Sequence, residues 1–145
     1  MSSSELAYSP AWLSQLHLLV TTFTGNVMAI QNALASLAVS DIAAAISWYS
    51  RLFDRAADTQ PMPNLAEWKF PNGGWLQIYQ GIERAGKGSV TLSVDNLEQH
   101  ISALQKLGVD THDYATNVHV KTLMIKDPDG NSIALAQAIN SQMAR

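Results

Sequence analysis

The sequence predicts an α+β fold built from two copies of a βαβββ module. Three observations support this prediction. Two segments of the first half recur in the second half, each copy begins with an alternating strand followed by a capped helix, and each copy ends with a glycine-containing turn and a strand. At 145 residues and 15.8 kDa, the chain has the length of one domain, or of one domain with a tail.

The internal repeat consists of two matches in the same order. Residues 36–53 (SLAVSDIAAAISWYSRLF) match residues 91–108 (TLSVDNLEQHISALQKLG) at an offset of 55. Residues 71–80 (PNGGWLQIYQ) match residues 128–137 (PDGNSIALAQ) at an offset of 57. Two matches in the same order and at nearly the same offset are unlikely to arise by chance. The difference of two residues between the offsets corresponds to one small loop insertion.

Each module begins with a strand and a capped helix. Alternating residues predict strands at 33–39 and 89–94. Asp41 and Asn96 follow these strands, and both are favoured N-cap residue types. Apolar residues then recur at helical spacing, at Ile42, Ala45, Ile46, Tyr49, Leu52 and Phe53 in the first helix and at Leu97, Ile101, Leu104 and Leu107 in the second. Gly108 is expected to end the second helix.

Three further strands complete each module. The second strand of each module is predicted near residues 56–58 and 110–113, where the pattern is weakest. The remaining strands have β-rich composition and are predicted at 65–70, 75–79, 119–125 and 132–136. The turns PNGG and DPDGN precede the last strand of each module, with Pro setting the first corner and Gly supplying a positive φ.

The repeat also sets the predicted domain boundaries. A single domain is expected at residues 29–140, with module one at 33–81 and module two at 88–137. The segment GIERAGKGS between them lacks the spacing of a phosphate-binding loop and is interpreted as a linker. Residues 1–28 form an N-terminal extension with two open interpretations. Either Ser9-Pro10 starts an amphipathic helix, or Met28 is the natural start. The apolar face of that helix would hold Trp12, Leu16, Leu19 and Phe23.

Composition excludes several classes of protein. Charged residues make up 14% of the chain, against a usual figure of about 25%, so we expect a neutral surface or a surface partly hidden in an oligomer. A net charge of −3 with 9 Lys+Arg argues against nucleic-acid binding. The absence of cysteine excludes disulfides, thiolate metal sites and thiol nucleophiles. The sequence offers neither a membrane span nor a basic signal-peptide start, so the expected location is the cytoplasm.

Three pieces of the chain together resemble the vicinal oxygen chelate superfamily. They are LAVSDIAAAISWYSRLF, LSVDNLEQHISALQKLGV and IKDPDGNSIALAQ, and the resemblance covers residues 33–137. This superfamily includes glyoxalases, bleomycin-resistance proteins, extradiol dioxygenases and methylmalonyl-CoA epimerases. The resemblance implies two βαβββ modules whose sheets curl around one cup-shaped cavity, and it implies a homodimer.

The resemblance also implies four strand positions that hold a divalent metal ion in metal-dependent members. These positions align with Leu34, Gln77, Ser89 and Ala134, and the repeat offsets relate the first to the third and the second to the fourth. Leu34 and Ala134 carry no donor atom, Ser89 is a poor neutral ligand and Gln77 is a weak one. The sequence therefore predicts no metal and no cofactor, and it leaves enzymatic activity open.

The same alignment predicts which side chains line the cavity. Alternation along the last strand of module one puts Trp75, Gln77 and Tyr79 on the cavity side, and it turns Leu76 and Ile78 toward the helix. The matching cavity positions of module two are small, at Ser132, Ala134 and Ala136. The candidate ligand-binding residues are Trp75, Gln77, Tyr79, Ser89, Thr91 and His119.

Three functions follow as hypotheses. The leading one is a metal-free small-molecule binding protein that sequesters an apolar or planar compound. The alternative is a divergent glyoxalase-type lyase or isomerase, or a dioxygenase-like enzyme. Such an enzyme would use a relocated metal, or Glu67 or His119 as a metal-free base. A third is an oligomerisation domain whose cavity is filled by Trp75 and Tyr79. Glu67 is expected to be solvated, because burying it without a partner is costly.

Overall fold

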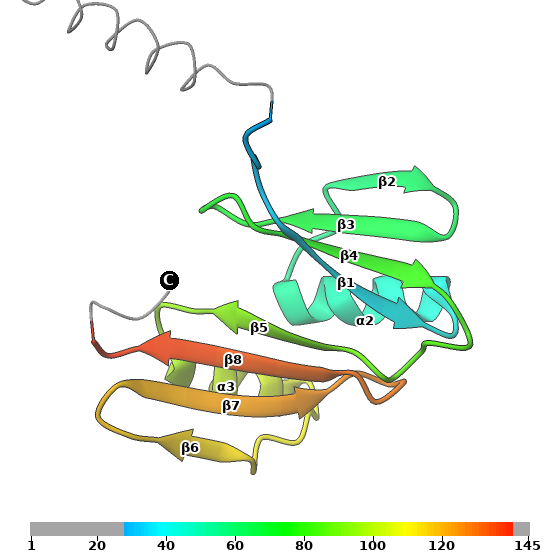
Figure 1. Cartoon of the computed structure of the whole chain (residues 1–145). Helices are drawn as coiled ribbons and strands as arrows, with labels where there is room; N and C mark the ends of the chain where they lie inside the picture. The colour runs from blue at the N-terminus through cyan, green and yellow to red at the C-terminus, as the bar shows by residue number, and fades with distance from the viewer. Residues whose placement is uncertain (1–27, 141–145) are drawn as a thin grey trace, which may run out of the picture. The chain divides into compact units, whose positions relative to one another are not determined.

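The computed structural model describes residues 28–140, and residues 32–140 belong to one compact unit (Figure 1). Both interpretations of the N-terminal extension, a helix from Ser9-Pro10 or a natural start at Met28, concern residues 1–27, which lie outside the described residues. Within the described part, neither helix is long and apolar enough to cross a lipid bilayer.

Two modules with the same topology make up this unit. The first module contains β1 (Leu34–Val39), α2 (Ile42–Phe53), β2 (Thr59–Met62), β3 (Leu65–Lys69) and β4 (Trp75–Gln80). The second module contains β5 (Ser89–Ser93), α3 (Leu97–Lys106), β6 (Tyr114–Thr116), β7 (Val120–Lys126) and β8 (Ser132–Ala138). The sheets have the orders β1-β4-β3-β2 and β5-β8-β7-β6, and in each the first and last strands of the module pair in parallel. The predicted α+β fold of two βαβββ modules is confirmed.

The second strand of each module begins later than predicted. The strands expected near residues 56–58 and 110–113 lie at Thr59–Met62 and Tyr114–Thr116. Both are short, fully exposed edge strands, so they lack the alternation that marks a strand in sequence. The residues just before them form local turns instead. For example, the Asp110 side chain accepts a hydrogen bond from the backbone N–H of His112 at 3.0 Å.

The two helices begin at the predicted caps. The side chain of Asp41 accepts a hydrogen bond from the N–H of Ala44, and that of Asn96 accepts one from the N–H of Gln99, both at 3.2 Å. Gly108 follows α3 with φ +76, a left-handed conformation that glycine adopts without strain. These local signals fix where the helices start and stop.

The glutamines shared by the two copies also cap helices. The side-chain oxygen of Gln80 accepts a hydrogen bond from the N–H of Ile42 at 3.2 Å, and that of Gln137 accepts one from the N–H of Leu97 at 2.8 Å. Each glutamine thus ties the last strand of its module to the first turn of its helix. Its bond satisfies a helix N–H that has no partner inside the helix.

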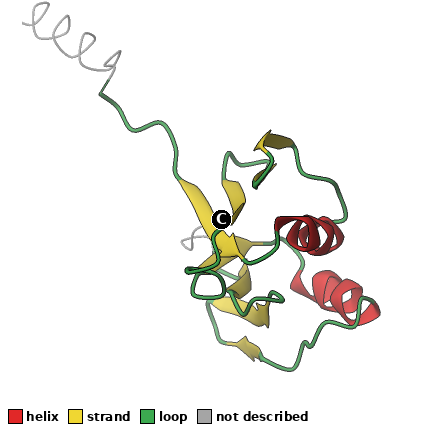
Figure 2. Ribbon diagram, turned by 90° about the vertical axis from the view of Figure 1, so that its right-hand side faces the viewer, coloured by secondary structure: helices red, strands yellow, loops and turns green. Residues whose placement is uncertain are grey.

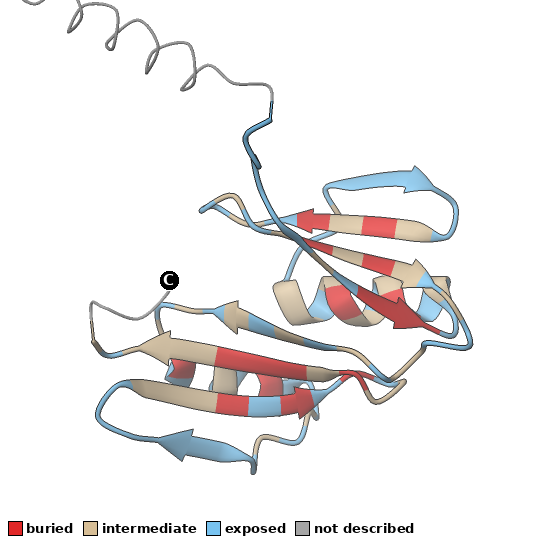
Figure 3. Cartoon of the chain, viewed as in Figure 1, coloured by how far each residue is buried: buried red, intermediate tan, exposed pale blue. Residues whose placement is uncertain are grey.

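Aromatic side chains fill the space between α2 and the first sheet. Tyr49 and Trp68 are fully buried, and their ring centroids lie 6.0 Å apart. Phe53 lies 5.7 Å from Trp68 and 5.5 Å from Phe70, ring centroid to ring centroid. Figure 3 shows buried residues on β1, β3, β4, β7 and β8 and on the helices, whereas β2 and β6 are exposed. This cluster supplies much of the apolar area that stabilises the first module.

A buried carboxylate joins the two modules. Asp127, 4% exposed, lies in the DPDGN turn before β8. Its Oδ2 accepts hydrogen bonds from the Tyr49 hydroxyl and from the Asn131 side-chain amide, both at 2.7 Å. Its Oδ1 accepts from the backbone N–H groups of Asp129 and Asn131, at 3.0 and 2.8 Å. Burial and the bond to this carboxylate raise the pKa of Tyr49 well above its ordinary value, so the hydroxyl remains a donor.

Two further residues of this turn bind the first module. Asn131, fully buried, donates from its side-chain amide to the carbonyl of Ala38 on β1 at 2.8 Å and accepts from the N–H of Gly88 at 2.9 Å. Both carboxylate oxygens of Asp129 accept hydrogen bonds from Ser40, one from its N–H and one from its hydroxyl. The DPDGN turn therefore holds α2, β1 and the linker between the modules together.

The linker passes so close to this turn that it requires glycine. Gly86 has φ +81, and a Cβ on it would lie 2.0 Å from the backbone oxygen of Asp129. A Cβ on Gly88 would lie 2.7 Å from the side chain of Leu37. Gly86 therefore permits close packing of the linker against the DPDGN turn, and Gly88 permits close packing against β1.

We expect Gly86→Ala to destabilise the domain by about 2–4 kcal/mol, because left-handed strain and a backbone clash add together. Gly108→Ala is the matched control. It has the same sign of φ but nothing within 4 Å of its Cβ, so it should cost only about 1–2 kcal/mol. Urea denaturation followed by circular dichroism measures both. Equal losses for the two variants would contradict the close approach at Gly86.

We expect Tyr49→Phe to destabilise the domain by about 1.5–3 kcal/mol, because it removes a hydrogen bond to a buried charged carboxylate. Tyr114→Phe, on edge strand β6 and 40% exposed, is the control and should change the free energy of unfolding by less than about 0.5 kcal/mol. Both are read from thermal and urea unfolding. A loss at Tyr49 no greater than at Tyr114 would rule out an energetic contribution of this bond.

Candidate ligand-binding site

The alternation along β4 separates two faces of the first sheet. Leu76 and Ile78 are fully buried on the side of α2, whereas Trp75, Gln77 and Tyr79 are half-buried on the opposite face. Figure 2 shows both helices on one side of the strands. We call the opposite side of each sheet its open face. The sequence predicted this division along β4.

One polar row crosses the open face of the first sheet from edge to edge. It contains one residue from each strand, and the strand register makes them cross-strand neighbours: Ser36, Gln77, Glu67 and Thr59. The Ser36 hydroxyl donates to the Gln77 side-chain oxygen at 2.8 Å, and the Gln77 amide donates to Glu67 Oε2 at 2.7 Å. The Thr59 hydroxyl donates to Glu67 Oε1 at 2.9 Å. We call this set the central row.

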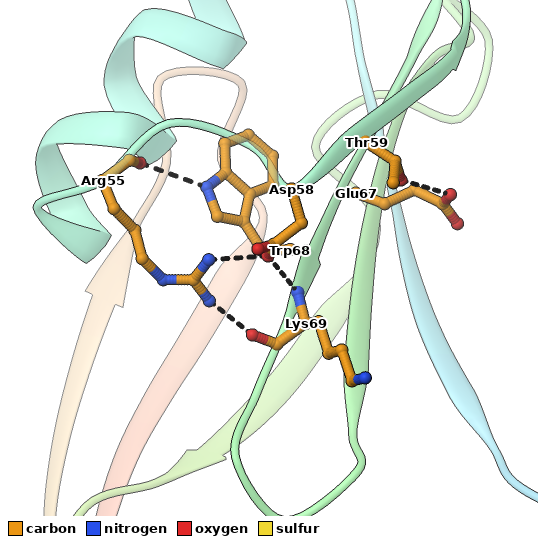
Figure 4. Close-up of polar contacts among 6 residues, drawn as sticks. All are labelled: Arg55, Asp58, Thr59, Glu67, Trp68 and Lys69. Atoms are coloured by element: carbon orange, nitrogen blue, oxygen red, sulfur yellow. Dashed lines mark hydrogen bonds and ion pairs between the residues drawn. The ribbon is translucent and has the colours of Figure 1, made fainter.

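A second set of contacts fixes the position of Thr59 at the edge of the sheet (Figure 4). The Arg55 guanidinium donates to Asp58 Oδ2 at 2.6 Å and also to the carbonyl of Lys69. The same oxygen of Asp58 accepts from the N–H of Lys69 at 2.7 Å, and the indole N–H of Trp68 donates to the carbonyl of Arg55. The hydrogen bond from Arg55 holds the pKa of Asp58 below its ordinary value. These bonds tie the end of α2 to β3 immediately before Thr59 begins β2.

Apolar side chains flank the central row on both sides. On one side Trp75 pairs with Leu34 and Lys69, and the Lys69 ammonium lies 5.7 Å from the centroid of the Trp75 ring. On the other side Tyr79 pairs with Leu65 on β3. The first sheet therefore presents hydrogen-bonding groups between two aromatic rings, an arrangement that suits a planar molecule with polar substituents.

On β5 and β8 the open face of the second sheet carries small side chains, and β7 adds Met124 and Lys126 to the same face. Ser89 and Thr91 on β5 are exposed, and they pair with Ser132 and Ala134 on β8. Ala136 continues this row of small residues. β1 and β5 are the strands through which the two sheets touch, so Ser89 and Thr91 lie on the strand next to the first sheet. In the described residues no hydrogen bond joins them to Trp75, Gln77 or Tyr79.

The donor atoms at the four aligned metal positions do not fit a divalent cation. Leu34 and Ala134 contribute only carbon, Ser89 contributes a hydroxyl, and the side-chain oxygen of Gln77 already accepts a hydrogen bond from Ser36. Across residues 28–140, no group of three or more His, Asp or Glu side chains is placed to hold a metal ion. These four side chains are therefore not a ligand set for a divalent cation.

His119 lies apart from the central row. It is exposed and immediately precedes β7, and its N–H donates to the Asn117 side chain at 2.7 Å. Alternation along β7 puts it in phase with Leu123 and Ile125, which are buried on the side of α3. The structure brings Gln77 together with Ser36, Glu67 and Thr59 and leaves His119 outside that group.

Gln77 is the one residue of the central row that the sequence predicted as a ligand contact. Ser36 and Thr59 were not predicted, and Glu67 was predicted only as the base of the alternative enzyme. Glu67 was expected to be solvated, yet it is half-buried and has partners on both oxygens. Only the register between β3 and β4 reveals this, because Gln77 is ten residues away in the chain. Ser36 carried a usable signal, since the repeat offset relates it to Thr91, a candidate already chosen.

Comparison with solved structures identifies the family. The chain is 31% identical to the glyoxalase / bleomycin resistance protein from Catenulispora acidiphila DSM 44928; the match covers 74% of this chain and 98% of that chain, with a TM-score of 0.68. The chain therefore belongs to the glyoxalase / bleomycin resistance protein family, and the predicted resemblance to the vicinal oxygen chelate superfamily is confirmed. No protein-family model and no curated protein sequence matches the chain.

Two more distant structures share the fold alone. TnmS3, an antibiotic binding protein from Streptomyces sp. CB03234, is 24% identical over 77% of this chain and 98% of its own, with a TM-score of 0.65. Lactoylglutathione lyase from Agrobacterium tumefaciens is 15% identical over 76% of this chain and 95% of its own, with a TM-score of 0.62. One fold thus supports both a binding protein and a lyase, and the residues of the site must distinguish them.

We expect Trp68→Ala to destabilise the domain by about 3–5 kcal/mol, because Trp68 is fully buried. Trp75→Ala, which truncates a half-buried ring on the open face, should cost less than about 1.5 kcal/mol. Chemical denaturation of the two variants measures the difference. Equal losses would show that Trp75 is part of the core, as the oligomerisation-domain hypothesis requires.

Proposed function

We propose that this protein binds a small, planar or apolar organic molecule on the open face of its first sheet and sequesters it without chemical turnover. The observation that carries the proposal is the central row. Its hydrogen-bonding side chains run across a surface-accessible sheet between two aromatic rings. Ligand sites typically combine an apolar, aromatic lining with a few fixed polar groups, and this face has both.

In this proposal each candidate residue has a distinct task. Trp75 and Tyr79 stack on the ligand, and Gln77 orients it through the amide N–H that its bond to Glu67 leaves free. The small side chains around Ser89 and Thr91 leave room beside the first sheet and add hydroxyl groups. Such a protein needs only slow release of its ligand, so it requires neither a nucleophile nor a general base.

Binding is proposed to be independent of metal. The support is the donor set, since Leu34 and Ala134 stand where metal-dependent relatives carry ligands. A glyoxalase-type lyase would need a metal held elsewhere or a positioned base. The strands of the first sheet's open face offer one carboxylate, Glu67, and His119 does not join it. TnmS3, described as an antibiotic binding protein, shows that this fold is compatible with binding.

A homodimer is part of the proposal. Only 14% of the chain is charged, and several large apolar side chains are exposed in the compact unit. They range from 46% to 79% exposed and comprise Leu34, Met62, Ile82, Leu107, Val118 and Ile139. A self-complementary interface would remove such side chains from water.

Native mass spectrometry of the purified full chain tests the proposal. We expect the mass spectrum to show a dimer that takes up no stoichiometric Ni²⁺, Zn²⁺, Mn²⁺ or Fe²⁺. We also expect planar aromatic compounds to bind, which a fluorescence titration detects as quenching of tryptophan emission. Trp75→Ala and Gln77→Ala should each weaken that binding by about tenfold, which corresponds to about 1.4 kcal/mol. Gln99→Ala, exposed on α3, is the control and should bind normally.

One tightly held metal ion per subunit would contradict the metal-independent proposal and would direct the search toward a lyase or isomerase activity. Ligand binding that is unchanged in both Trp75→Ala and Gln77→Ala would move the binding site away from the open face of the first sheet.

A further inference from the structure

Glu67, on the open face of the first sheet, forms no ion pair with a described residue. Within residues 28–140 its two carboxylate oxygens are bound by the Thr59 hydroxyl and by the Gln77 amide, which are both neutral donors. The ion pairs of this part of the chain join Arg55 to Asp58, His112 to Asp110 and Lys121 to Glu98. Glu67 therefore carries a half-buried negative charge that no described cation neutralises.

The nearest lysine along the chain is held elsewhere. Lys69 lies on the same face of β3, two residues from Glu67, but its ammonium lies over the Trp75 ring, 5.7 Å from the centroid. Lys126, which the repeat offset relates to Lys69, donates to the Ser132 hydroxyl in the second sheet at 2.7 Å. Neither cation reaches the carboxylate of Glu67.

The two hydrogen bonds from neutral donors hold the Glu67 carboxylate in place and leave part of its acceptor capacity unused. A carboxylate accepts about four hydrogen bonds in total, and residues 28–140 supply one to each oxygen of Glu67. Because both partners lie in the same cross-strand row, the carboxylate is fixed in the sheet, and a ligand can bind at the acceptor sites that no described residue fills. A bond from a charged N–H donor to such a group is about twice as strong as a bond between neutral groups.

We propose that the site selects planar ligands that carry a cationic N–H group, such as an amidinium, a guanidinium or a protonated amino-heterocycle. The N–H group would bind Glu67, and the ring would stack on Trp75 or Tyr79. The inference rests on the proposed ligand-binding function and names its ligand class. A cationic N–H donor neutralises the charge of Glu67 and also supplies a hydrogen bond to it. An anionic ligand of the same shape meets an unpaired carboxylate instead.

Three probes of nearly equal shape separate charge from stacking: 2-naphthamidine, 2-naphthamide and 2-naphthoate. Isothermal titration calorimetry with the full chain measures their affinities. We expect the amidine to bind at least tenfold more tightly than the amide, with the carboxylate weakest, because bonds to charged groups exceed neutral bonds by about that factor. The quenching of tryptophan fluorescence, lost in Trp75→Phe, reports on stacking at this face.

Glu67→Gln is the decisive variant, since it keeps the size of the side chain and removes its charge. It should lower the affinity for 2-naphthamidine about tenfold and leave the affinity for 2-naphthamide within about twofold. Lys69→Met is the matched control on the same strand and face. It removes the opposite charge and should preserve or increase the preference for the amidine. The unfolding midpoint of each variant shows that the fold is retained.

The outcomes separate the inference from the proposed function. If all three probes bind the open face equally, or if Glu67→Gln leaves the preference unchanged, the ligand class is wrong while binding at this face stands. If 2-naphthoate binds most tightly and Lys69→Met abolishes its binding, the site selects anions through Lys69 and the inference is overturned. If no probe binds and fluorescence is unchanged, both the inference and the proposed function fail.

Discussion

The fold depends on one buried carboxylate. Asp127 accepts four hydrogen bonds from inside the domain, and one of them crosses from the second module to Tyr49 on α2. A buried charge is tolerated only when it is fully hydrogen-bonded, so these donors must hold their positions together. Asn131 extends the same network to the backbone of β1. The DPDGN turn is therefore both a hairpin turn within module two and the principal polar junction between the modules, and it sets the positions of β1 and the linker.

The two modules share the same arrangement of strands and helix, but the side chains on their open faces differ. The residues that recur, such as the cap pair Asp41 and Asn96 or Gln80 and Gln137, hold a helix to its sheet in each copy. The central row does not recur. The repeat offsets relate Ser36, Gln77 and Glu67 to Thr91, Ala134 and Met124, where the connected polar row is lost. The open face of the first sheet is therefore polar and aromatic, whereas that of the second carries small residues on β5 and β8 beside Met124 on β7.

The central row links the proposed ligand-binding function to the stability of the first sheet. Glu67 is held by neighbours from β2 and β4, and the β2 neighbour, Thr59, is positioned by the bonds that Arg55 and Asp58 make at the end of α2. The hydrogen bond that lowers the pKa of Asp58 thus supports a residue of the open face as well as an edge strand. Preorganised polar groups bind a ligand with less loss of side-chain freedom, which is the advantage of building the row on four strands rather than on a loop.

The sequence by itself determined the elements that depend on local signals. The repeat, the Asx caps and the alternation along β4 predicted the α+β class, the two modules, both helix starts and the faces of Trp75, Gln77 and Tyr79, because periodicity and capping act over a few residues. The predicted positions of the exposed edge strands β2 and β6 were too early in the chain, because these strands carry no alternating burial pattern. Only the tertiary structure decided that Glu67 has two neutral partners, that His119 lies outside the row, and that Tyr49 meets Asp127 across 78 residues. These facts depend on strand register and on the packing of one module against the other, which no local pattern encodes.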